Sequence, residues 1–237
     1  MSLLPWLNPQ DNFPSVDSAL DDPNGLLAAG GDLSEERLIQ AYRNGIFPWS
    51  SDDQPLLWWS PDPRCVIFPN HVHISRSLKK AIRKGGFSVS FDQSFKEVID
   101  HCARGEEHSG GWITEEMKYA YLNLAERGIA HSIEVWWNDL LVGGLYGLSF
   151  GRTFFGESMF SLKSNASKIA FAALCTQARN WNFPLIDCQI ENEHLLSLGA
   201  ELIPRDVFME KIQHGMKHKE ALSWRFDEDI LDQILAS

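Results

Sequence analysis

The segment 143–189 constrains the fold more than any other part of the chain. It reads GGLYGLSFGRTFFGESMFS, then a helical stretch that opens at NASK, and then LIDCQ. This order predicts two strands, a helix and a further strand, which together build a cleft. Side chains alternate along a strand, so Asp187 and Gln189 are expected to share one face. An acid on the buried side of an apolar strand is costly unless a site uses it, which directs attention to Asp187 and, across the cleft, to Glu157.

The composition is that of an ordinary packed protein. The 237 residues are 44% hydrophobic and 11% aromatic, which suits one or two domains with normal cores. No window approaches the ~20 apolar residues of a membrane span, and the N-terminus lacks a basic region followed by an apolar run. The four cysteines show no CxxC spacing, so we expect reduced thiols and a cytoplasmic location.

The net charge of −11 argues against a polyanionic partner, but the basic residues are unevenly placed. Between residues 64 and 84 there are six basic residues and no acid. The segment ISRSLKKAIRKGG predicts a short helix that begins after Ser75 and ends before two glycines. Its cations are interpreted either as a solvated helix face or as a dock for a polyanion. The candidate docking residues are Arg76, Lys80, Arg83 and Lys84.

Turn signals divide the chain into a small N-terminal lobe, residues 1–62, and a second domain, residues 63–237. Pro61 and Pro63 mark the join. In the second domain Thr114 is expected to cap a helix, and Asn138-Asp139 is expected to close a hairpin. The segment ELIPRDVF is predicted as a last strand. Mixed strands and helices favour an α/β or α+β layered architecture.

The order of elements in the second domain resembles the Gcn5-related N-acetyltransferase fold. Enzymes of that fold hold the pyrophosphate of coenzyme A on a glycine-bearing loop before the central helix. Here that position reads MFSLKSNASK, with no glycine between Gly156 and Gly199. We therefore expect no coenzyme A. The histidine pairs His71/His73 and His214/His218 lack partners that would complete a metal site, so no metal is expected either.

A larger set of motifs resembles the leucyl/phenylalanyl-tRNA–protein transferase family. They are PNGLLAAGGDLS, AYRNGIFPW, LWWSPDPR, HSIEVW, LVGGLYG, GESMFS, ASK, LIDCQ and HLLSLGAELIPR, in order over residues 13–208. Such enzymes move Leu or Phe, sometimes Met, from aminoacyl-tRNA to a protein that starts with Arg or Lys. The product is marked for degradation by the bacterial N-end rule. The resemblance implies a small N-terminal lobe, an acetyltransferase-like catalytic domain, and no cofactor.

The resemblance also implies roles for the three polar residues of the cleft. The reaction is aminolysis of an ester, and an α-amine with a pKa of about 7.7–8.0 is partly neutral at pH 7. Positioning and uptake of one proton would then suffice. The family pattern has Asp187 polarise Gln189, which contacts the amine, and it places Glu157 in the cleft. An acid at that position is expected to pair with the basic acceptor terminus. The alternatives are that Asp187 only satisfies a loop N–H and that Glu157 is an exposed strand-edge acid. Whether Asp187 acts as a base or orients Gln189 stays open.

The donor side of the predicted site is apolar and aromatic, because Leu and Phe share only apolar bulk. Trp112 matches a family tryptophan that stacks on the terminal adenine, and Trp49 and Tyr121 match other cleft residues. Ordinary core packing is the alternative for each. The relative preference for Leu, Phe and Met stays open, since two family positions carry smaller side chains here, Leu174 and Ala178. The matching pocket positions are Leu145, Phe154, Phe171, Leu174 and Ala178.

Three rival functions follow from the same sequence. One is a transferase of this fold with another acyl donor, which would need the missing coenzyme A loop. Another is an aminoacyl-tRNA transferase of the cell-wall type. The last is a non-catalytic adaptor that binds tRNA or N-terminal degrons, and it predicts binding that survives the loss of Asp187.

Overall fold

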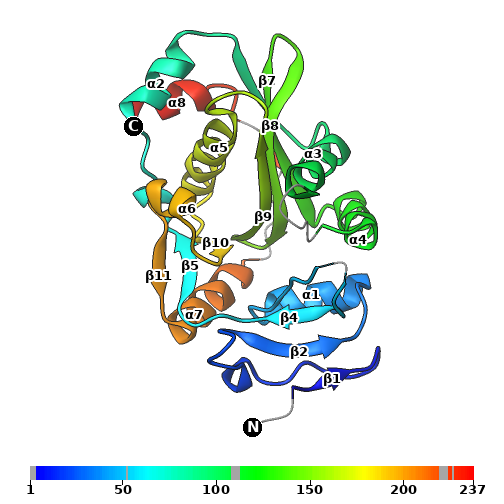
Figure 1. Cartoon of the computed structure of the whole chain (residues 1–237). Coiled ribbons are helices and arrows are strands. Elements are labelled where there is room, and N and C mark those ends of the chain that lie inside the picture. Colours follow the sequence, from blue (N-terminus) through cyan, green and yellow to red (C-terminus); the bar gives the residue numbers. More distant parts are fainter. Residues whose placement is uncertain (1–3, 52, 108–112, 219–223, 226) are drawn as a thin grey trace.

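Figure 1 shows the computed structural model of the chain, which describes residues 4–51, 53–107, 113–218, 224–225 and 227–237. The strands form two separate sheets. The smaller sheet lies at the N-terminal end, and the larger one forms the centre of the rest of the molecule (Figure 1). Two cis peptide bonds precede Pro23 and Pro63.

The smaller sheet has the strand order β1-β2-β4-β3. Its centre is Trp58, which is fully buried and donates its indole N–H to the carbonyl oxygen of Gly30 at 2.8 Å. One helix, α1, packs beside it and buries Leu38, Ala41 and Tyr42. The elements are β1 (Trp6–Leu7), η1 (Val16–Ser18), β2 (Leu26–Gly30), α1 (Glu35–Arg43), β3 (Phe47–Pro48) and β4 (Leu57–Trp59).

The larger sheet has the order β11-β5-β10-β9-β8-β7-β6. All its neighbouring strands are antiparallel except β10 and β9, which run in the same direction. The parallel register pairs Asp187 with Phe155, so the residues two positions further, Gln189 and Glu157, come side by side. The strands are β5 (Arg64–Ile67), β6 (Phe87–Phe91), β7 (Ala130–Trp137), β8 (Leu140–Phe150), β9 (Thr153–Ser161), β10 (Ile186–Gln189) and β11 (Glu201–Ile203).

Helices cover both faces of the larger sheet (Figure 1). The central helix α5 packs on one face, and α3 with α4 packs on the other. The short helix α8 lies between α5 and α2. The helices are η2 (Pro69–His71), α2 (Arg76–Arg83), α3 (Phe95–Glu107), α4 (Glu115–Glu126), α5 (Ala166–Asn180), α6 (Glu193–Ser197), α7 (Arg205–Met216) and α8 (Ile230–Ala236).

Several local predictions are confirmed. The hydroxyl of Ser75 accepts from the N–H of Leu78 at the start of α2, and the hydroxyl of Thr114 accepts from Met117 at the start of α4. The hairpin between β7 and β8 turns at Asn138-Asp139, both at positive φ. The mixed α/β architecture is also as predicted.

One predicted element is wrong in its extent, and several elements were not predicted. The last strand ends at Ile203, because Pro204 lacks an N–H and instead caps the helix α7. Phe208 and Ile212, four residues apart, form the buried side of this helix. Strand β5 was not predicted, although it pairs with both β10 and β11.

Candidate active site

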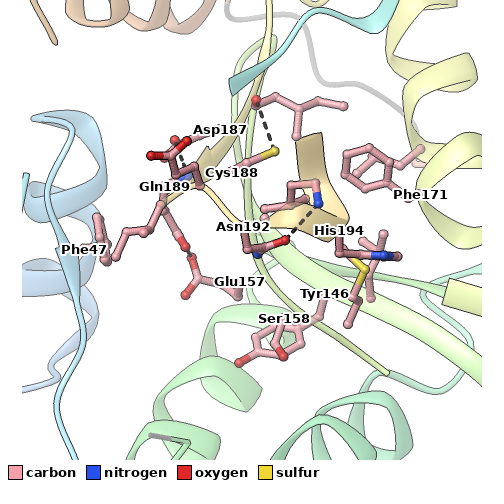
Figure 2. A pocket seen from close by; sticks show the side chains of 18 of the residues that line it. Phe47, Tyr146, Glu157, Ser158, Phe171, Asp187, Cys188, Gln189, Asn192 and His194 are labelled. Atoms are coloured by element: carbon pink, nitrogen blue, oxygen red, sulfur yellow. Dashed lines mark hydrogen bonds between the residues drawn. The ribbon is translucent and has the colours of Figure 1, made fainter. Parts of the chain in front are cut away.

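A cavity of about 720 Å³ lies between the N-terminal lobe, the strands β8–β10 and the start of α6. In Figure 2, Glu157, Gln189 and Asn192 lie near the middle of the view, with Phe47 on one side and Phe171 on the other. The polar group consists of Glu157, Ser158, Asp187, Gln189, Asn192 and His194. The apolar wall includes Leu145, Met159, Phe171 and Leu174.

Glu157 is the centre of the polar group. Its side chain projects from β9, where Oε1 accepts from Nε2 of Gln189 and Oε2 accepts from the hydroxyl of Tyr121, both at 2.8 Å. Removal from water raises the pKa of Glu157, and the hydrogen bonds from its neighbours oppose this, with a resulting pKa of about 7. The side chain of Glu157 is half-buried, so Glu157 is not an exposed strand-edge acid. Because its pKa is about 7, both of its protonation states are accessible near neutral pH.

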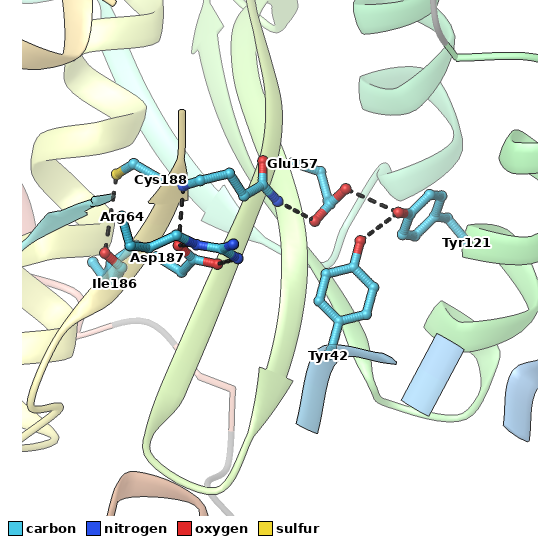
Figure 3. A network of polar contacts seen from close by, with 8 residues as sticks. Tyr42, Arg64, Tyr121, Glu157, Ile186, Asp187 and Cys188 are labelled. Carbon is cyan, nitrogen blue, oxygen red and sulfur yellow. Dashed lines mark hydrogen bonds and ion pairs between the residues drawn. The ribbon is translucent and has the colours of Figure 1, made fainter. Parts of the chain in front are cut away.

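Two tyrosines support this carboxyl group, Tyr121 from α4 and, behind it, Tyr42 from α1 of the N-terminal lobe (Figure 3). The hydroxyl oxygens of Tyr42 and Tyr121 are 2.6 Å apart. Because Tyr121 donates its proton to Glu157, Tyr42 must donate to Tyr121. Burial and the nearby Glu157 carboxylate raise the pKa of both phenols, which therefore stay protonated donors. Tyr42 was not predicted as a site residue, and no local pattern indicates it.

Asp187 forms an ion pair with a buried arginine, Arg64. Its Oδ1 and Oδ2 accept from Nε and Nη2 of Arg64 at 2.8 and 2.7 Å, and both residues are fully buried. The guanidinium also lies 4.7 and 4.6 Å from the ring centres of Phe47 and Phe208. Asp187 is thus held in a two-point ion pair. Arg64 lies in the quoted motif LWWSPDPR, yet the sequence alone did not indicate its role.

The backbone at Gln189 departs from a regular strand. Its φ is +63°, and the pairing of β10 with β5 shifts register between Asp187 and Gln189. The Oδ1 atom of Asp187 accepts from the backbone N–H of Gln189 at 3.0 Å, which supports this turn. The expectation that both side chains share one face is therefore wrong: Asp187 reaches Arg64, and Gln189 reaches Glu157 (Figure 3).

The predicted donor residues fall into four groups. Trp49, Leu145, Phe171 and Leu174 line the cavity. Phe154 and Ala178 do not, because both are fully buried in the core behind it. Trp112 lies outside the described residues. Tyr121 enters the site through its bond to Glu157.

The predicted docking helix α2 presents its cations to solvent. Leu78 and Ile82 face the core, and α8 packs beside them. Within the described residues, none of the predicted docking residues forms an ion pair. These exposed residues are Arg76, Lys80, Arg83 and Lys84.

In the described ranges, no group of three or more His, Cys, Asp or Glu side chains is arranged to hold a metal ion. Among those residues, no helix has the length and apolar character needed to cross a bilayer.

Comparison with known proteins shows the family. A family model described as leucyl/phenylalanyl-tRNA protein transferase matches residues 66–213, and the model of its N-terminal domain matches residues 31–62. A relative from Pseudomonas putida (strain W619) is 55% identical over 94% of this chain and 100% of that protein. One from Azotobacter vinelandii is 56% identical over 90% and 95%, and one from Nitrosospira multiformis 51% over 96% and 99%. All three are named leucyl/phenylalanyl-tRNA–protein transferase.

These matches define the class of the protein as an aminoacyltransferase that uses aminoacyl-tRNA. The chain belongs to the leucyl/phenylalanyl-tRNA protein transferase family. One solved structure shows a much weaker similarity. The structure of L-PGS from Bacillus licheniformis is 10% identical, covers 70% of this chain and 54% of that chain, and has a TM-score of 0.39. This similarity is too low to support an argument.

Proposed function

We propose that this aminoacyltransferase moves Leu or Phe, with Met as a third donor, from aminoacyl-tRNA to the α-amino group of proteins that begin with Arg or Lys. The transfer would take place in the cytoplasm and mark the acceptor for N-end rule degradation. The single observation that carries the proposal is the Glu157–Gln189 pair at the polar side of a cavity with an apolar wall. One side suits an amine and the other a Leu or Phe side chain. A catalytic domain resembling the Gcn5-related N-acetyltransferases is part of the proposal.

The orientation of Gln189 supports a role in holding the amine. Its Nε2 donates to Glu157, an orientation assigned from the hydrogen-bond network, so its Oε1 remains to accept from the attacking amine. The nitrogen attacks the ester carbonyl carbon, a C–N bond forms, and the C–O bond to the ribose breaks. The ammonium proton passes to Glu157, and the ribose oxygen takes up a proton as it leaves. A carboxyl group with a pKa of about 7 can accept and return such a proton.

Asp187 acts in this proposal as a positioning residue. Both its oxygens are occupied by Arg64, and its buried position gives an amine no approach. It holds the backbone N–H of Gln189 and so fixes the left-handed turn that directs Gln189 at Glu157. Asp187 thus accepts from a loop N–H, that of Gln189, and by this same hydrogen bond it orients Gln189.

The rim of the cavity supports a basic acceptor. Glu191 and Glu193 line the cavity and are exposed, next to Glu157. A peptide that begins with Arg or Lys carries a side-chain cation close to its α-amino group. The carboxylates of Glu191 and Glu193 would stabilise these two neighbouring positive charges in the cavity. A peptide that begins with Ala lacks the second cation.

The apolar wall supports the proposed donors. Leu145, Phe171 and Leu174 offer hydrophobic contact without a polar group, which distinguishes donors by size and shape only. The backbone phosphates of the tRNA would contact the exposed cations of α2. Because phosphate contacts carry no sequence information, several tRNAs would serve.

The test is transfer of labelled phenylalanine from Phe-tRNA to a peptide that begins with Arg, beside one that begins with Ala. Transfer to the Arg peptide alone is expected. No transfer to either peptide, with Phe-tRNA still bound, would overturn the proposal. In the same assay Gln189→Ala should lower kcat with little change in donor affinity, and an equal loss of Phe-tRNA binding would contradict its role. Reversal of Arg83 and Lys84 to Glu should weaken tRNA binding and flatten its salt dependence.

A further inference from the structure

We infer that the tRNA interface continues beyond α2, across the tip of the β7–β8 hairpin, to Lys163 and Lys168 at the start of α5. On this surface the backbone phosphates of the single-stranded 3′ end of tRNA would pass from the docking helix to the cavity. The inference rests on the proposed function, because the aminoacyl end is taken to lie in the cavity and the acceptor stem on α2.

Side-chain contacts join the end of α2 to Lys163 through Trp137. After Lys84 the chain passes through Gly86, where a Cβ would come within 3.0 Å of the Trp137 ring. Trp137 lies at the tip of the hairpin, and Phe87 packs edge-on against it with ring centres 4.6 Å apart. The ammonium of Lys163 lies 4.1 Å from the centre of the same ring. Trp137 therefore connects the two basic segments.

The backbone of Lys163 is fixed before any ligand arrives. The N–H groups of Leu162 and Lys163 both donate to the carbonyl oxygen of Val142, at 2.8 and 3.3 Å. The carbonyl oxygen of Lys163 accepts from the hydroxyl of Ser161 at 2.8 Å. With its ammonium held over Trp137 by a cation–π contact, Lys163 has less conformational freedom to lose on binding a phosphate than a free surface lysine.

Lys168 extends the same surface to the mouth of the cavity. It lies in the first turn of α5, close enough to His194 for its charge to act on the imidazole. His194 lines the cavity, and burial first, then the charge of Lys168, lowers the pKa of this imidazole. A positive potential thus reaches the opening through which the 3′ end of the donor would enter.

Lys163 and Lys168 differ in their pairing from the lysines of α3 and α4. Lys96 and Lys118, on α3 and α4, form ion pairs with Asp100. In the part of the chain that the structure describes, neither Lys163 nor Lys168 forms an ion pair. On a chain with a net charge of −11, unpaired cations that adjoin a basic helix fit a polyanion, and the donor tRNA must cross this region.

The experiment compares Lys163→Glu with a matched reversal, Lys217→Glu. Lys217 is exposed at the end of α7. Helix α7 lies in the lower part of Figure 1, whereas α2 lies at the top. Binding of Phe-tRNA is measured over a series of salt concentrations, and transfer is measured with two donors, Phe-tRNA and phenylalanyl-adenosine, which has no phosphate chain. Lys163→Arg, which retains the cation, tests for rescue, and circular dichroism checks that each variant is folded.

For Lys163→Glu we expect the Kd for Phe-tRNA to rise about tenfold at low salt, and its salt slope to fall by about 0.7–0.9 for one lost phosphate contact. The ratio of kcat/KM for Phe-tRNA to kcat/KM for phenylalanyl-adenosine should fall about tenfold. Lys217→Glu should match the unaltered protein, and Lys163→Arg should restore binding. Equal binding by the Lys163→Glu and Lys217→Glu variants would overturn the inference. Failure of the unaltered protein to transfer from either donor would instead overturn the proposed function.

Discussion

Replacement of Glu157 by Gln should make the protein more stable at alkaline pH while it loses activity. Burial raises the pKa of Glu157 from an ordinary value of 4.5 to about 7. That difference corresponds to about 3 kcal/mol, at about 1.4 kcal/mol for each pH unit. The folded protein binds this proton more tightly than the unfolded chain. Below pH 4.5 the Glu157 carboxyl group therefore does not lower the free energy of unfolding. Between pH 4.5 and 7 it lowers that free energy progressively, and above pH 7 the decrease is complete.

Urea denaturation of Glu157→Gln and of the unaltered protein at pH 5, 6, 7 and 8 measures this cost. The difference in free energy of unfolding should increase with pH to at most about 3 kcal/mol, less what Gln loses in accepting only one of the two hydrogen bonds. The exposed Glu116→Gln on α4 is the matched control and should show a small, pH-independent difference. A constant difference for Glu157→Gln between pH 5 and 8 would refute the assignment of a buried, proton-holding carboxyl group.

Three further substitutions test the surroundings of the site. Tyr121→Phe removes a donor to the ionised form of Glu157, so the pKa of that carboxyl should rise and the pH midpoint of kcat/KM should shift upward by about one unit; an unshifted midpoint would contradict this. Arg64→Met leaves the buried carboxylate of Asp187 without its partner and should lower the free energy of unfolding, measured in urea, by about 3–5 kcal/mol. The double variant Arg64→Met, Asp187→Asn should recover part of that loss. Strictly additive effects of the two substitutions would contradict the role of the ion pair. Gly143→Ala places a methyl group against the first residue of α5 and should cost about 1–3 kcal/mol, measured as a lower Tm, unless the helix moves freely.

The parts of the fold with local signals could be predicted from the sequence. Ser75 and Thr114 each cap a helix through the N–H three residues on, an interaction contained within one short segment. The hairpin at Asn138-Asp139 needs two residues that tolerate positive φ, and these two do. In the same way, the acids of the cleft stand out because they interrupt apolar strands.

Arg64, which holds Asp187, and Tyr42, which holds Tyr121, could not be predicted, because each comes from a distant segment of the sequence. Arg64 and Asp187 are 123 positions apart, and Tyr42 and Tyr121 are 79 apart. The turn at Gln189 was also missed, since residues other than glycine rarely adopt positive φ and nothing in LIDCQ indicates it. Regular alternation of side chains along that strand consequently placed Gln189 on the same face as Asp187, which is wrong.

The network around Glu157 also determines where this chain can be divided. A fragment that began at residue 63 would retain Glu157, Asp187 and Gln189, yet it would lack Tyr42 and Phe47. Water would then reach the phenol of Tyr121 and one face of the guanidinium that holds Asp187. Such a fragment would carry the complete set of acids and the amide without the surroundings that set their proton affinity. The N-terminal lobe thus contributes to the candidate site, and transplanting the larger sheet alone into another protein would leave Glu157 and Asp187 without part of their surroundings.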